Sequence, residues 1–298
     1  MISTRNILIK IGNSGKGQVL SPDNLSKLHK HLFKIYRDIE KVCNNHGLKI
    51  CLAYGNVIGA MRHGGWIPWD DDLDIHMSRE DYDKFLSFYS SELPPQYQVS
   101  SYLSEKGSFS RFAKVIDTTT VYVPIGESKT DESGVYIDIF PIDNVKAQPR
   151  LNVIRRYWAY FLMYTAASVY QVQEGTREYR DLMFSSKAGR ANWYFRQSWG
   201  WIFGFTSYRV WNRWIENYAK YSKHTGKVHI MADLWACYRM IPEDYFFPFR
   251  EIELPEIGKV HIPNKYNEYL KFFYGDWRKI PNDADKWHHY VSEFYIPD

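Results

Sequence analysis

The sequence of 298 residues predicts an α/β (α+β) fold, in which a mixed-sheet core is followed by an aromatic-rich helical region. Up to about residue 145, short apolar runs typical of strands alternate with segments of helical period. From residue 150 to residue 223, long helical patterns dense in Trp, Tyr and Arg replace them. The predicted parts are an N-terminal arm (1–20), an α/β core (21–145), a basic aromatic helical region (146–225) and a C-terminal segment that packs back on the core (226–298).

The first predicted elements are a long helix, a buried strand and a short helix. Ser21 and Pro22 suit a helix start, because Ser caps the first turn and Pro fits the first helical position. Apolar residues then recur at helical spacing as far as Val42. The strand is expected over residues 48–54, and the short helix over residues 57–62.

The next predicted elements are a strand over residues 73–77 and a helix that Ser78 and Asp81 open as a capping box. Four further strands are expected over residues 97–103, 109–117, 119–124 and 135–140. Near the C-terminus, residues 259–263 read as a strand and residues 265–274 as a helix. This mixture supports the α+β class for the core.

Composition narrows the functional classes. The net charge of +4 is too small to indicate a nucleic-acid partner. The three cysteines form no CxxC pair, so neither a disulfide framework nor a structural zinc site is expected. We see no apolar core of a signal peptide near the start, and no run of the roughly 20 apolar residues that span a bilayer. The expected location is cytoplasmic, with peripheral contact to the inner membrane face left open.

The helical region carries a strong local charge. Between Arg150 and Lys223 there are 12 basic and four acidic residues, an excess of +8 that leaves −4 for the rest of the chain. Such asymmetry favours an anionic partner, either a lipid headgroup, a phosphorylated glycan or substrate phosphates, although a solvated helical face is the alternative. The aromatic content of 17% is compatible with sugar, nucleoside or membrane-interface contacts, and equally with a Tyr-rich core and surface.

Four aspartates, Asp70, Asp71, Asp72 and Asp74, lie directly before and inside an apolar strand. Alternate strand residues share a face, so Asp72 and Asp74 are expected to point the same way. Neighbouring carboxylates repel each other unless a cation neutralises them, and hard oxygen ligands suit Mg²⁺ (or Mn²⁺). We therefore predict a metal site at Asp72 and Asp74, with Asp70 and Asp71 as lesser candidates for a second metal or its waters. The alternative is a solvated acidic turn.

A glycine turn precedes these acids. Tyr54-Gly55-Asn56 is expected to close a strand and open a helix, where backbone N–H groups can meet a phosphate. With an Asp-x-Asp strand 17 to 19 residues after Gly55, this matches the pattern of the polymerase-β-like nucleotidyltransferase fold. That pattern gains a third carboxylate from a later strand, and Asp138 suits the role, unless it only caps a turn. The predicted catalytic and metal set is Asp72, Asp74 and Asp138.

Other residues are expected to contact substrate. Arg62 lies about one helical turn beyond the glycine loop, and a guanidinium can bind phosphate in a bidentate way. Lys114 alternates with an apolar residue on a predicted strand, where a buried ammonium needs an anion. A surface or structural ion pair is the alternative for both. The predicted substrate-binding set is Gly55, Asn56, Arg62, Lys114 and Trp69. His288 and His289 are expected at the surface.

The glycine turn and the acidic strand together resemble the motif of a known protein family. Residues 54–75, which read YGNVIGAMRHGGWIPWDDDLDI, are similar to the signature of the LicD family. This family includes bacterial phosphocholine transferases and, more distantly, fukutin and fukutin-related protein. Residues 138–143, 262–263 and 274–277 also resemble family motifs, so that the similarity covers about residues 30–145 and 260–280. Asn56 departs from the usual Ser or Thr after the glycine.

The resemblance implies transfer of a phospho-alcohol group, phosphocholine first, from a CDP-linked donor to a glycan or lipid-linked glycan hydroxyl. Lipopolysaccharide, teichoic acid or capsule would be the modified material. Asp72 and Asp74 would hold Mg²⁺ against the donor pyrophosphate, and Asp138 would complete the site and accept the hydroxyl proton. Two alternatives remain, a nucleotidyltransferase that adds a nucleoside monophosphate to a small molecule or sugar, and a non-catalytic glycan- or membrane-binding protein.

Overall fold

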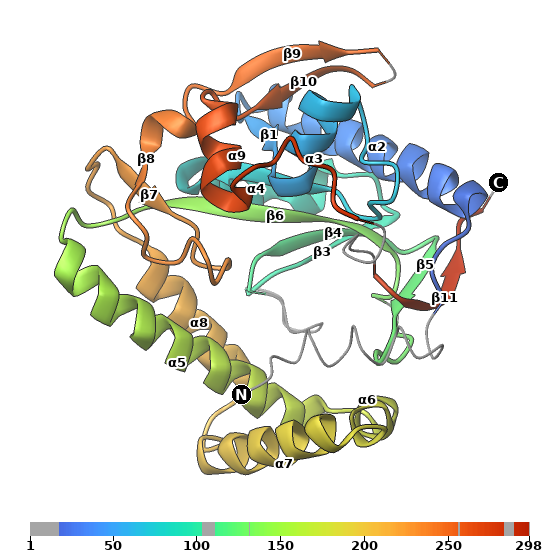
Figure 1. Ribbon diagram of the computed structural model, residues 1–298, viewed down its shortest axis with the longest axis vertical. Coiled ribbons are helices and arrows are strands. Elements are labelled where there is room, and N and C mark those ends of the chain that lie inside the picture. The colour runs from blue at the N-terminus through green and yellow to red at the C-terminus, as the bar shows by residue number, and fades with distance from the viewer. Residues whose placement is uncertain (1–17, 103–110, 131, 256, 283–288, 298) are drawn as a thin grey trace.

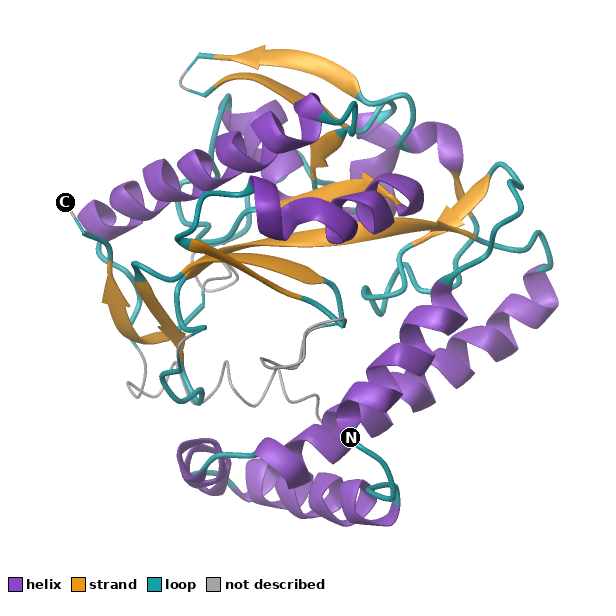
Figure 2. Cartoon of the chain, turned by 180° about the vertical axis from the view of Figure 1, so that it is seen from behind, coloured by secondary structure: helices purple, strands orange, loops and turns teal. Residues whose placement is uncertain are grey.

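The computed structural model describes residues 18–102, 111–130, 132–255, 257–282 and 289–297 (Figure 1). Residues 1–17 of the predicted N-terminal arm lie outside these ranges. In Figures 1 and 2 a central sheet is accompanied by helices, and the helices of residues 149–219 lie together on one side of it. The structure confirms the α+β class with a mixed sheet, as in nucleotidyltransferase-like folds.

The central sheet has the strand order β1-β2-β6-β4-β3 and continues from β6 through β7 to β8. Strands β2 and β6 are parallel, whereas the other neighbours are antiparallel. The strands are β1 (Ile50–Leu52), β2 (Asp74–Ser78), β3 (Tyr97–Ser100), β4 (Ala113–Asp117), β6 (Val135–Asn144), β7 (Lys227–His229) and β8 (Ile241–Pro242).

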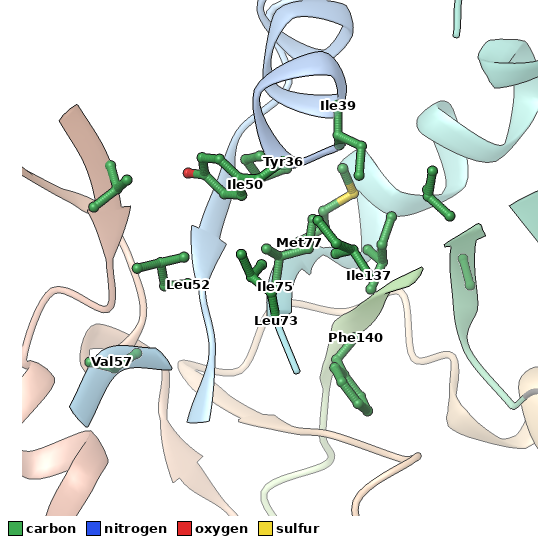
Figure 3. Packing of buried hydrophobic residues seen from close by; sticks show 14 of the residues in the cluster. Tyr36, Ile39, Ile50, Leu52, Val57, Leu73, Ile75, Met77, Ile137 and Phe140 are labelled. Carbon is green, nitrogen blue, oxygen red and sulfur yellow. The ribbon is translucent and has the colours of Figure 1, made fainter. Parts of the chain in front are cut away.

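Two helices build the main core against this sheet. Helix α2 (Pro22–Asn45) is capped by Ser21, whose side chain accepts a hydrogen bond from the backbone of Asn24 (3.3 Å). Helix α4 (Arg79–Glu92) is capped by Ser78, which accepts from the backbone of Asp81 (3.0 Å). Both predicted starts are confirmed. Figure 3 shows the packing, in which side chains of α2 meet those of β1, β2 and β6. The labelled residues are Tyr36, Ile39, Ile50, Leu52, Val57, Leu73, Ile75, Met77, Ile137 and Phe140.

The glycine turn differs from the sequence expectation. The strand predicted over residues 48–54 ends at Leu52, and helix α3 (Tyr54–Ile58) begins three residues earlier than expected. It continues as a π-helix (η2, Gly59–His63). Tyr54 has a φ of 45°, a left-handed conformation that is uncommon for a bulky residue. Its N–H donates to the Tyr269 hydroxyl (2.8 Å), so a residue distant in the sequence holds the turn in place.

C-terminal elements contact the first half of the chain. Strand β11 pairs with β5, β10 pairs with β9 and contacts β1, and α9 contacts α3. The predicted strand and helix at residues 259–274 are confirmed. These elements are β5 (Val121–Pro124), the 3₁₀-helix η3 (Glu243–Tyr245), β9 (Arg250–Leu254), β10 (Gly258–Ile262), α9 (Tyr266–Tyr274) and β11 (Val291–Tyr295).

The predicted helical region is present, and within it α5 packs against both α7 and α8. It comprises α5 (Pro149–Glu174), α6 (Arg177–Phe184), α7 (Lys187–Ile202) and α8 (Tyr208–Ala219), and we call residues 149–219 the helical region. A Cβ at Gly200 would lie 2.1 Å from the Ser168 carbonyl oxygen, so glycine permits the close approach of α7 to α5. Within the described ranges, no helix is both long and apolar enough to span a membrane.

Candidate active site

Three neighbouring strands bring three of the predicted site residues into one row. Asp74 on β2 is in register with Asp138 on the parallel strand β6, and Asp138 is in register with Lys114 on the antiparallel strand β4. Registered neighbours share a face of the sheet, so two carboxylates and one ammonium stand side by side. The Lys114 Nζ lies 2.8 Å from the Asp138 Oδ1. Asp72 precedes Asp74 by two positions and extends the row.

The opposite face of the same strand is apolar, as alternation predicts. Leu73 and Ile75 are buried in the main core, and Figure 3 shows them between the neighbouring strands. Burial of this face fixes the strand, because a shift by one residue would bring Asp72 and Asp74 into the core. The apolar alternation therefore determines the orientation of the acids.

The acids repel one another in a half-buried setting. Burial is the largest cause that raises the pKa of Asp72 to about 6, and the charges of Asp71 and Asp138 raise it further, against His289 and Lys114. Burial, followed by the charges of Asp72, Asp138 and Asp70, raises the pKa of Asp74 well above its usual range. Burial also raises the pKa of Asp138, while the ion pair with Lys114 opposes the shift. The site is therefore short of positive charge.

These acids suit a divalent cation in an open site. Within the described ranges, no group of three or more His, Cys, Asp or Glu side chains is already arranged to hold a metal ion. Mg²⁺, however, is commonly held by one or two carboxylates together with water and substrate phosphates. Asp72 and Asp74, with Asp138 beside them, are hard oxygen donors whose repulsion a cation would relieve. The residues present therefore fit a cation that completes its coordination on a bound diphosphate.

Asn56 connects the glycine turn to the acidic strand. Its Oδ1 accepts a hydrogen bond from the Asp74 backbone N–H (2.7 Å), and its Nδ2 donates to the Asp72 carbonyl oxygen (3.0 Å). The buried amide thus holds the backbone on both sides of Leu73 and sets the spacing of the two carboxylates. The structure gives Asn56 this positioning role, and the phosphate contact expected of it stays a prediction.

Gly55 provides room for Asp70. A Cβ at position 55 would lie 2.9 Å from the Asp70 Oδ2, closer than real Cβ contacts. The Asp70 backbone is held in turn by its carbonyl oxygen, which lies 2.7 Å from the His29 Nε2. Burial, and then the charges of Asp72 and Asp71, raise the pKa of Asp70 well above its usual range. Glycine therefore allows a fourth carboxyl group to approach the turn.

Asp71 is turned toward the C-terminal segment. Its Oδ2 accepts from the backbone N–H of His289 (3.0 Å) and from the Tyr122 hydroxyl (3.2 Å), and its Oδ1 lies 2.8 Å from the His289 Nδ1. Burial lowers the pKa of His289, but the hydrogen bond to Asp71 and the charges of Asp71 and Asp72 raise it overall. The expectation that His289 lies at the surface is met in part, because its side chain is 31% exposed but is held by Asp71, whereas His288 lies outside the described residues.

Arg62 also has partners in the C-terminal segment. Its Nη1 donates to the carbonyl oxygens of Trp277 (2.7 Å) and Lys279 (3.2 Å), and its Nε donates to the His63 Nε2 (3.0 Å). The guanidinium thus ties residues 277–279 to η2, and its expected contact with a substrate phosphate stays a prediction. Trp69 lies edge-on to His63, with ring centroids 5.9 Å apart.

Two tyrosines that the sequence did not single out lie near the acids. Burial raises the pKa of Tyr274 well above its usual range, and the charges of Asp74, Asp70 and Asp72 add to the shift. The hydroxyl oxygen of Tyr54 is buried and forms no hydrogen bond within the described structure. Tyr54 and Tyr274 lie in the stretches 54–75 and 274–277 that resemble family motifs. Their place in these motifs is the feature of the sequence that could have identified them as site residues.

Comparison with known proteins agrees with this geometry. Residues 47–165 match the family described as LicD/FKTN/FKRP, nucleotidyltransferase domain. The matched range includes the acidic strand, Lys114 and Asp138.

One relative extends the likeness over most of the chain. The sequence is 25% identical to the lipopolysaccharide cholinephosphotransferase LicD of Haemophilus influenzae over 270 residues, which cover 86% of this chain and 91% of that protein. It is also 31% and 32% identical, over 71 residues, to uncharacterised proteins of Rickettsia prowazekii and Rickettsia typhi. These matches cover 24% of this chain and 25% and 21% of the two proteins.

Proposed function

This chain belongs to the LicD family, and from that premise we propose that it transfers a phospho-alcohol group from a CDP-linked donor to a glycan hydroxyl. Phosphocholine is the first candidate, because the relative that aligns with most of the chain is named as a cholinephosphotransferase. The acceptor we propose is a cell-surface glycan or its lipid-linked precursor, reached from the cytoplasmic side.

One structural observation supports the proposal independently of sequence similarity. Asp72, Asp74, Asp138 and Lys114 converge on one face of three adjacent strands, where charge is left unbalanced. A donor diphosphate with a divalent cation would supply the missing counter-charge. Mg²⁺ (or Mn²⁺) bound by Asp72 and Asp74 would neutralise charge that develops on the departing CMP.

The chain's own residues provide the remaining chemistry. Asp138 lies beside the metal-binding pair, and its raised pKa suits it to take the proton of an acceptor hydroxyl. The acceptor oxygen then bonds to the phosphorus of the phospho-alcohol, and the bond to the CMP oxygen breaks. Lys114, 2.8 Å from Asp138, keeps that carboxyl ionised before the transfer and holds it in place.

Product analysis tests the reaction class. The purified chain is incubated with CDP-choline and an acceptor glycan extract, or with CTP, in the presence of Mg²⁺. Release of CMP from CDP-choline, lost in Asp74→Asn and kept in the control Asp181→Asn (exposed by 68%), is the expected result. Pyrophosphate released from CTP, without CMP from CDP-choline, would instead identify a nucleotidyltransferase.

A further inference from the structure

The outer face of α7 is apolar, the reverse of an ordinary surface helix. Tyr194, Phe195, Trp201 and Ile202 recur at helical spacing and are exposed by 55%, 44%, 79% and 64%. Phe205, in the turn that follows, is exposed by 73%. The buried residues of α7 are the small or polar Gly189, Asn192 and Gly200, of which Gly200 faces α5, and Trp199 beside it donates a hydrogen bond to Thr165 of α5. Tyr194 and Phe195 meet the rings of Phe184 and Tyr164 at one edge, but packing within the chain leaves the greater part of the aromatic side exposed.

A second apolar stripe lies at the start of α5. Ile154, Tyr157 and Trp158 follow one another at helical spacing and are exposed by 65%, 68% and 50%. Farther along this helix α7 covers the corresponding face, but α7 ends at Ile202 and leaves the first turns uncovered.

Ring contacts join the two stripes. Trp158 stacks on Phe161, with centroids 4.9 Å apart, and Phe161 meets Phe203 edge-on at 5.5 Å, just after α7. We call the joined surface the apolar face. Its exposed members are Ile154, Tyr157, Trp158, Tyr194, Phe195, Trp201, Ile202 and Phe205.

Basic side chains accompany this face. Arg150 is exposed on the α5 stripe, Lys187 and Arg190 are exposed at the start of the outer side of α7, and Arg213 is exposed beside Trp214 on α8. None of the four forms an ion pair with any described residue, although Arg190 lies over the Phe184 ring, and residues 150–223 carry a charge excess of +8. A second copy of the chain on this face would bring like charges together, whereas an anionic surface would be attracted.

We propose that the apolar face docks on an anionic lipid bilayer. Trp, Tyr, Phe and Ile beside unpaired Arg and Lys are the combination that seats helices at the membrane interface, where apolar burial and attraction to headgroups act together. The biological role of this docking rests on the proposed function, because docking would bring the active site to a lipid-linked acceptor. The binding itself requires no turnover.

Vesicle flotation of the whole chain tests the proposal. Wild type should float with phosphatidylglycerol/phosphatidylethanolamine vesicles and much less with phosphatidylcholine vesicles. The triple variant Ile154→Ser, Trp201→Ser, Ile202→Ser should bind about tenfold more weakly or less, because these side chains no longer leave water. The matched control Val19→Ser, Tyr295→Ser replaces exposed apolar residues outside the helical region, at 49% and 56% exposure, and should bind as wild type does.

Charge is tested separately with Arg150→Gln, Arg190→Gln. This variant should bind anionic vesicles roughly fivefold more weakly per lost charge, with a smaller dependence on salt. Equal flotation of wild type and the triple variant would overturn the proposal. It would also be overturned if wild type formed a dimer that did not float and the triple variant were a monomer.

Calorimetric binding of CDP-choline in solution separates this proposal from the function. The triple variant should bind the donor as wild type does. Flotation without donor binding would leave docking supported and remove the proposed function. Donor binding without flotation would support the proposed function and remove the docking proposal.

Discussion

Replacing Asp72 by asparagine should stabilise the metal-free protein while it removes activity. Asp72 has an ordinary pKa of 3.8 and a pKa of about 6 in the folded chain, chiefly because it is buried. Each pKa unit corresponds to about 1.4 kcal/mol, so keeping this group ionised in the folded state costs up to about 3 kcal/mol at pH 7. Relaxation and water lower that figure, and we expect a gain of about 1–3 kcal/mol for Asp72→Asn.

The sign of the pH dependence follows from the raised pKa. An acid whose pKa is higher in the folded state lowers stability once pH exceeds the unfolded value, and the loss is complete above the folded value. The difference in unfolding free energy between Asp72→Asn and wild type should therefore be small at about pH 4, grow through pH 6 and reach its full size above about pH 7. Added Mg²⁺ should narrow it, because the cation stabilises the wild type.

Urea unfolding followed by tryptophan fluorescence, in EDTA and in Mg²⁺ between pH 4 and pH 8, measures this difference. Turnover of Asp72→Asn should be abolished under the same conditions in which Asp181→Asn remains active. A variant that is less stable than wild type at pH 7 in EDTA would refute the reasoning, because burial and repulsion would then not dominate at this position.

Two other substitutions test the supports of the site, and a third tests a buried ion pair between α4 and β6. Asn56→Ala removes both hydrogen bonds to the acidic strand, and we expect a loss of about 2–4 kcal/mol in unfolding free energy together with a large fall in turnover; unchanged turnover would argue against its positioning role. Gly55→Ala places a Cβ against Asp70 and should weaken Mg²⁺-dependent donor binding in calorimetry about tenfold or more, and wild-type affinity would show that Asp70 moves freely. Arg79→Gln leaves the fully buried Asp143 without its two hydrogen bonds from the guanidinium and should cost about 3–5 kcal/mol in urea unfolding, so a loss below about 1 kcal/mol would contradict the account.

The parts that depend on local periodicity could be predicted from the sequence. Alternation around Leu73 gave the orientation of Asp72 and Asp74, and the apolar surroundings of Asp138 placed it on a strand. Capping residues located the starts of α2 and α4 for the same reason, because cap and helix are neighbours in the chain.

The parts of the site that depend on partners distant in the sequence could not be predicted. Asp71 meets His289 across 218 positions, and Arg62 meets Trp277 across 215, so nothing near either residue indicates its partner. Asn56 bonds backbone atoms, which no side-chain pattern reveals. Periodicity in α7 likewise shows two faces but does not say that the aromatic one is outside, because that depends on what packs against the glycines.

The central claim is that the row of acids binds a CDP-linked donor through a divalent cation. Calorimetry with CDP-choline, CDP-ethanolamine, CDP-glycerol, CDP-ribitol and CTP, with Mg²⁺ and with EDTA, tests it for wild type, Asp74→Asn and Asp181→Asn. We predict that one CDP-alcohol binds better than CTP in wild type and Asp181→Asn, only with Mg²⁺, and that Asp74→Asn does not bind it. Equal binding by Asp74→Asn, or binding that EDTA leaves unchanged, would contradict the claim.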